Sequence, residues 1–114
     1  MQVENQNPAS FKPSVTNVFI LNNAAWDVYL HSENKQEIKK AIKWIDYTMK
    51  LDTTAKIQAN DLDTKAALVY KSGHPNEAIA IEQKAADLQP KSNKGYIEKI
   101  EKMRRGEKLW LEEN

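Results

Sequence analysis

The sequence predicts an all-α protein, and three observations lead to that prediction. Apolar residues recur at spacings of three and four through most of the chain, which is the period of a helix buried along one side. Only three glycines and four prolines occur, and they stand between the periodic segments. Because both residue types interrupt helices, they indicate where helices begin and end.

The first two predicted helices cover residues 13–31 and 34–51, and a polar stretch, HSENKQE, forms the turn between them. Residues 1–12 are polar and unpatterned and are expected to form a flexible arm. The apolar stripe of the first helix consists of Val15, Val18, Leu21, Ala25 and Val28. The stripe of the second consists of Ile38, Ala41, Ile42, Ile45 and Met49, with Lys39, Lys40 and Lys43 facing away.

Three further helices follow. The third is expected from Asp61 to Ser72, with Asp61 and Asp63 as capping residues that suit the helix dipole. Gly73 closes it, Pro75 opens the fourth, and Pro90 prevents the fourth from continuing. The fifth begins near residue 92 or 93, and its apolar residues are Tyr96, Ile97, Ile100 and Met103.

The second pair of helices repeats the first. Four residues of the first helix match four residues of the third at a separation of 41: Leu21, Ala25, Val28 and Tyr29 with Leu62, Ala66, Val69 and Tyr70. The second and fourth helices match at a separation of 37: Ala41, Ile42 and Leu51 with Ala78, Ile79 and Leu88. The chain therefore contains a two-unit helical repeat whose first turn is the longer one.

The second unit, ANDLDTKAALVYKSGHPNEAIAIEQKAADLQP, resembles a tetratricopeptide repeat over its full length of about 34 residues. The residues that carry the resemblance are Ala66, Tyr70, Gly73, Glu77, Ala78, Ile79, Ala85, Leu88 and Pro90. Lys65 and Glu82 depart from it, because the family usually has large apolar groups there. The first unit matches less well, since it has an extended turn and Thr53 where proline is frequent.

The resemblance implies two antiparallel helix hairpins plus a C-terminal capping helix, stacked as a short right-handed solenoid. Residues 13–53 would be a divergent repeat, residues 59–92 a repeat, and residues 93–114 the capping helix and tail of one domain spanning 13–114. Solenoids need such a cap to cover the apolar face of their last repeat. The tail carries Leu109, Trp110 and Leu111, which are expected to fold back, to mediate a homodimer, or to mark a cut from a longer chain.

In the tetratricopeptide family, one strip on the first helix of each hairpin lines a concave groove that binds a protein or peptide. The strip corresponds here to Phe19, Asn22, Trp26, Tyr29, Asn60, Asp63, Ala67 and Tyr70. Aromatic rings bind with little loss of conformational entropy, and asparagine can pair with an extended backbone. The aromatic residues could equally be core, and Asn22 could bridge two helices.

A weaker resemblance, through LNNAAW, KKAIKW and LDTKAALVYKSG, is to a helical segment that follows thioredoxin-like domains in some bacterial proteins. It implies an alternative function, an accessory domain packed against an enzyme domain outside this chain. The chain would then belong to a larger periplasmic or secreted protein, whereas without this resemblance the compartment is open and could be cytoplasmic. A peptide-binding domain should show an open groove near Trp26 and Tyr70, whereas an accessory domain should expose an apolar face.

Composition argues against other classes of function. The net charge of +1 does not favour nucleic-acid binding, and no apolar run approaches the roughly 20 residues of a membrane span, so a soluble protein is expected. There is no cysteine for thiol chemistry, and His31 and His74 have no partner at metal-ligand spacing. No catalytic or phosphate-binding motif occurs. We therefore expect no enzyme activity, cofactor or metal.

Overall fold

The computed structural model describes residues 15–109, and within that range it contains five helices and no strand. The helices are α1 (Val15–His31), α2 (Lys35–Leu51), α3 (Ala55–Lys71), α4 (Pro75–Leu88) and α5 (Lys94–Arg104). The chain is therefore all-α, as predicted from its periodicity. The expected N-terminal arm, residues 1–12, lies outside the described residues.

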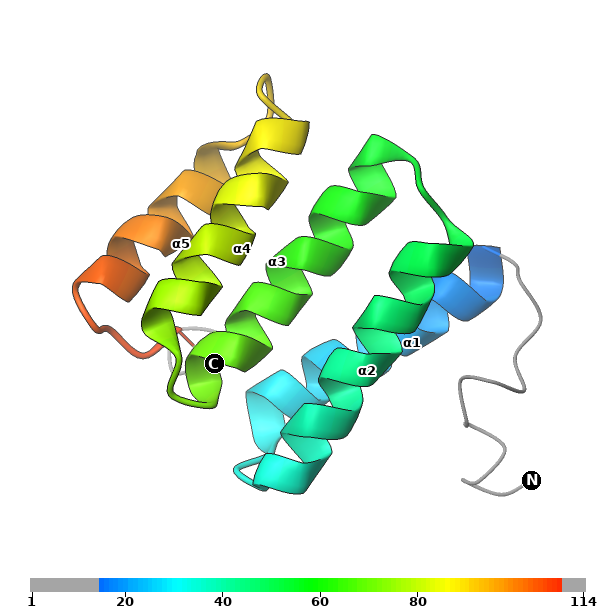
Figure 1. The fold of residues 1–114 in the computed structure, drawn as a ribbon, viewed down its shortest axis with the longest axis horizontal. Coiled ribbons are helices and arrows are strands. Elements are labelled where there is room, and N and C mark those ends of the chain that lie inside the picture. The colour runs from blue at the N-terminus through cyan, green and yellow to red at the C-terminus, as the bar shows by residue number, and fades with distance from the viewer. Residues whose placement is uncertain (1–14, 110–114) are drawn as a thin grey trace.

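The helices pack side by side in chain order (Figure 1). Each helix contacts the next, and α1 also contacts α3. α3 lies in the middle, with α2 on one side and α4 on the other, and α5 lies beyond α4. This arrangement of packed helix pairs is compatible with a repeated hairpin.

Asn34, Gly73 and Pro75 set helix boundaries close to the positions that the sequence predicts. The side-chain oxygen of Asn34 accepts hydrogen bonds from the backbone N–H groups of Gln36 and Glu37 at 2.9 and 3.0 Å, which caps α2. Gly73 adopts a φ of 95°, a conformation that side chains disfavour. Pro75 is the first residue of α4, where the helix needs no N–H donor.

α3 begins earlier than predicted, at Ala55 instead of Asp61. The turn before it is organised by Asp52, whose carboxylate accepts hydrogen bonds from the backbone N–H and the hydroxyl of Thr54 at 2.9 and 2.8 Å. Asp61 and Asp63 lie well inside the helix, and both are buried. The interpretation of these two aspartates as capping residues is therefore wrong.

Two pairs of equivalent positions are fully buried in both hairpins. Ala25 and Ala66, which are separated by 41 residues, are both fully buried. Small side chains at such positions allow neighbouring helices to approach closely. Ile45 of α2 is also fully buried, and its equivalent 37 residues later is Glu82, which is just as inaccessible. The second hairpin thus places a carboxyl group where the first has an aliphatic side chain.

One hydrophobic cluster joins all five helices, and its members include Tyr29, Ile45, Leu68, Ala78 and Met103. Leu109, which follows α5, belongs to the same cluster and is only 4% exposed. It packs against its own chain and offers little surface for the predicted dimer contact. Trp110 and Leu111 lie outside the described residues.

Candidate functional site

The predicted groove residues are placed at different depths. At the surface lie Phe19, which is 44% exposed, and Asn60. Trp26 and Tyr70 are half-buried. The buried members are Asn22, Tyr29 and Asp63.

α5 adds Lys99, which the sequence analysis did not single out. Its Nζ lies 5.1 Å from the centroid of the Trp26 ring and 3.0 Å from each carboxylate oxygen of Asp63. Both the ring and the carboxylate attract the ammonium group. These contacts join Trp26, Asp63 and Lys99 from three helices. The name α1/α3/α5 face is used here for these three residues together with Phe19 and Asn60, which helical spacing predicts on the same side of α1 and α3.

Two of the predicted groove residues, Tyr29 and Tyr70, make contacts within the chain. The ring of Tyr29 is 1% exposed and packs against Trp26 with a centroid separation of 4.7 Å. The hydroxyl of Tyr70 donates a hydrogen bond to the backbone oxygen of Glu107 at 2.6 Å. Tyr29 is therefore a core residue, which is the alternative that the sequence left open.

Asn22 is buried because it bridges helices. Its Nδ2 donates to Asp61 Oδ1 at 2.6 Å, and its Oδ1 accepts from the hydroxyl of Thr64 at 3.2 Å. Asp61 also accepts from the hydroxyl of Thr48 at 2.8 Å, so the network joins α1, α2 and α3. Burial raises the pKa of the Asp61 carboxyl, and the hydrogen bonds from Thr48 and Asn22 oppose that rise.

Asn22→Ala is expected to lower the free energy of unfolding by about 1–3 kcal/mol, because it leaves a buried carboxylate oxygen without its donor. The matched control is Asn23→Ala, which removes an exposed amide from the next position of α1 and should change stability by less than about 0.5 kcal/mol. Urea unfolding of the two variants measures the difference. Equal losses would show that the bridge contributes nothing specific.

Glu82 is a second buried acidic group. Its side chain is fully buried, and neither carboxyl oxygen has a hydrogen-bond partner. Burial raises the pKa of Glu82 to about 11, with a further increase from the neighbouring Asp63 and an opposing effect of Lys99. The carboxyl therefore stays protonated at neutral pH. As a neutral acid beside Asp63, it is a potential donor rather than a second charge.

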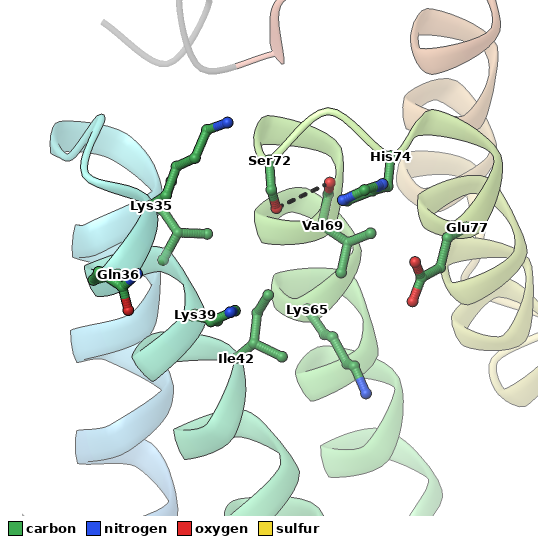
Figure 2. A pocket seen from close by; sticks show the side chains of 10 residues that line it. Lys35, Gln36, Lys39, Ile42, Lys65, Val69, Ser72, His74 and Glu77 are labelled. Carbon is green, nitrogen blue, oxygen red and sulfur yellow. Dashed lines mark hydrogen bonds between the residues drawn. The ribbon is translucent and has the colours of Figure 1, made fainter.

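A separate groove runs along α3, between α2 and the start of α4 (Figure 2). It has a volume of about 490 Å³ and is called here the α2/α4 groove. The apolar side chains of Ile42 on α2 and Val69 on α3 lie between these two helices (Figure 2). Its lining residues are Lys35, Gln36, Ile38, Lys39, Ile42, Lys65, Val69, Ser72, His74 and Glu77.

This groove was not predicted from the sequence, although a signal for it exists. Lys35, Lys39 and Lys43 recur every four residues, so they share one side of α2. From periodicity alone, these three lysines are expected to face solvent. Only the position of α4 shows that Lys35 and Lys39 border a cavity.

The described residues offer no arrangement for metal chemistry. In residues 15–109, no group of three or more histidine, aspartate or glutamate side chains is placed to hold a metal ion. His31 ends α1 with its Nε2 3.7 Å from Asp27, and His74 directly precedes α4. Over the same range, no helix has the length and apolar character to cross a membrane.

Comparisons with protein-family models, with curated protein sequences and with solved structures find no match for this chain. The resemblance to the tetratricopeptide family therefore stays a prediction from the repeat residues.

Proposed function

We propose that this chain is a non-catalytic module of tetratricopeptide type that binds a protein or peptide segment through the α1/α3/α5 face. The observation that supports the proposal is the position of Lys99, which contacts both Trp26 and Asp63. An aromatic ring, a cation and a carboxylate from three helices thereby share one surface. Scaffolds built from helical repeats use such composite surfaces for recognition.

The accessible end of the face has the chemistry that peptide binding requires. Phe19 presents an apolar ring, and Asn60, its equivalent 41 residues later on α3, presents an amide with both donor and acceptor groups. Trp26 and Lys99 follow at intermediate depth. An extended segment could therefore place an apolar side chain on Phe19 and pair its backbone with Asn60.

A peptide library displayed on phage tests the proposal. Peptides selected on the wild type are expected to bind the double variant Phe19→Ala, Asn60→Ala at least about tenfold more weakly, the usual effect of removing an interface anchor. Both side chains are exposed, so the variant should keep its melting temperature.

The matched control is the double variant Gln83→Ala, Lys84→Ala, which changes two exposed residues of α4. It should bind the selected peptides as the wild type does. A library that yields no binders would count against peptide recognition, and binders that ignore the first variant would place the site elsewhere.

The accessory-domain alternative has one observation in its favour. Phe19 and Ile20 are neighbours at the start of α1 and are 44% and 46% exposed. A folded domain could cover both side chains, whereas a short peptide would need only one of them as its anchor. Under this alternative the phage library yields no binders, while Phe19→Ser, Ile20→Ser raises the solubility of the chain.

A further inference from the structure

The α2/α4 groove contains cations without internal partners. Among the described residues, neither Lys35 nor Lys39 forms an ion pair. Glu37, the acidic residue in the first turn of α2, accepts a hydrogen bond from the hydroxyl of Ser32. Lys65 is the exception in the groove, because its Nζ lies 2.7 Å from Asp46 Oδ1.

The spacing of these lysines is unfavourable for the isolated helix. Lys35 and Lys39 are four residues apart, and like charges at that spacing destabilise a helix. Lys35 also lies at the N-terminus of α2, where the helix dipole disfavours a cation. The equivalent of Lys39 in the other hairpin, 37 residues later, is Asn76, so hairpin packing does not require a cation there. An external anion would relieve this repulsion.

The floor of the groove is apolar, and this favours some classes of anionic ligand over others. Val69 is 4% exposed and faces Ile42 across the gap between α2 and α3 (Figure 2). No phenylalanine, tyrosine, tryptophan or arginine side chain lines the groove, although single-stranded nucleic acids are usually bound by stacking on such groups, and His74 is the one ring among its lining residues. A groove with cations along its edge and an aliphatic floor therefore complements a ligand that carries carboxylates next to an aliphatic side chain.

The size and openness of the groove favour a chain segment over a small ion. Its volume of about 490 Å³ far exceeds the space of a carboxylate, and Lys35, Lys39, His74 and Glu77 are all exposed at its rim. Glu77 stands on the α4 side (Figure 2) and would repel an acidic ligand. Ligand carboxylates are therefore expected along the α2 side.

We infer that the α2/α4 groove binds an acidic peptide segment of a partner protein, with carboxylates on Lys35 and Lys39 and an aliphatic side chain against Ile42 and Val69. This site is separate from the α1/α3/α5 face. It would add a second contact to the same partner or recruit another one.

The test uses a fluorescein-labelled octapeptide, EELEELEE, and measures its binding by fluorescence anisotropy. The double variant Lys35→Gln, Lys39→Gln is expected to weaken binding about tenfold, as the loss of two ion pairs would. The double variant Lys84→Gln, Lys94→Gln makes the same change of net charge at exposed positions of α4 and α5 outside the groove. It should alter the affinity by less than about twofold. Glu77→Gln should strengthen binding.

Three further probes test the chemistry of the ligand. QQLQQLQQ lacks the charges and EESEESEE lacks the aliphatic side chains, so both should bind more weakly. Oligothymidylate should compete poorly. Equal effects of the two lysine pairs, equal binding of EESEESEE, strong competition by oligothymidylate, or no binding of EELEELEE would each overturn the inference.

The double variant Phe19→Ala, Asn60→Ala separates this inference from the proposed function. It should bind EELEELEE as the wild type does, because neither residue lines the groove. A loss of binding in this variant would place the acidic peptide on the α1/α3/α5 face and overturn the assignment to the groove.

Discussion

Replacing Glu82 with isoleucine is expected to raise the free energy of unfolding at pH 7 by about 2–4 kcal/mol. The carboxyl is fully buried, its nearest polar neighbour is the Asp63 carboxylate, and the equivalent position of the first hairpin holds Ile45. Isoleucine is apolar and needs no hydrogen-bond partner. It should fill the site without the desolvation that glutamate suffers there.

The effect should depend on pH in a defined direction. In the unfolded chain Glu82 loses its proton near its ordinary pKa of 4.5, whereas in the folded chain its pKa is raised to about 11. Between these values the folded state holds the extra proton, so stability falls as pH rises. From pH 5 to pH 8 the loss attributable to Glu82 is about 4 kcal/mol at most.

Urea unfolding followed by circular dichroism at pH 5 and pH 8 measures this dependence. Glu82→Ile and Glu82→Gln should both flatten it, and the glutamine variant should gain less stability because its amide stays buried. Asp61, whose pKa is also raised by burial, should leave a smaller slope of the same sign. The control Glu98→Gln changes an exposed residue of α5 and should leave the slope intact. A wild type more stable at pH 8 would contradict the prediction.

Tyr29→Ala is expected to lower the free energy of unfolding by about 3–5 kcal/mol, the usual effect of removing a buried aromatic ring. The ring is 1% exposed and contacts Trp26 at a centroid separation of 4.7 Å. The Nζ of Lys71, at the end of α3, lies 5.8 Å from the centroid of the Tyr29 ring. The cavity left by alanine therefore opens between α1 and α3.

Phe19→Ala is the matched control, because it removes a comparable ring from the same helix at a position 44% exposed. Its effect should stay below about 1 kcal/mol. Tyr29→Phe keeps the ring and should lose much less stability than Tyr29→Ala. Similar melting temperatures for Tyr29→Ala and Phe19→Ala would show that Tyr29 is not the core residue inferred from the structure.

Some residues of the two candidate surfaces could be predicted from the sequence, and others could not. The sequence predicts Phe19, Trp26 and Asp63 on one side of their helices, because helical spacing determines which residues share a side. It did not indicate Lys99, since α5 approaches α1 only in the folded chain. Nor did it indicate the α2/α4 groove, whose sides come from helices that are not neighbours in sequence.

The sequence by itself determined the fold class and most of the helix boundaries. Apolar spacing, the Asn34 cap, the positive φ of Gly73 and the position of Pro75 are local properties of a few consecutive residues. The early start of α3 was missed because residues 55–60 carry helix-forming residues without a clear apolar stripe.

Only the tertiary structure decided which polar groups are buried. Asn22 and Asp61 are 39 residues apart, and each is stable in the interior because the other supplies its hydrogen bond. Glu82 is buried beside Asp63, and that position together with burial raises the pKa of its carboxyl. Helical periodicity indicates which side of a helix turns inward. The free energy of a buried polar group depends on atoms that distant parts of the chain bring to it.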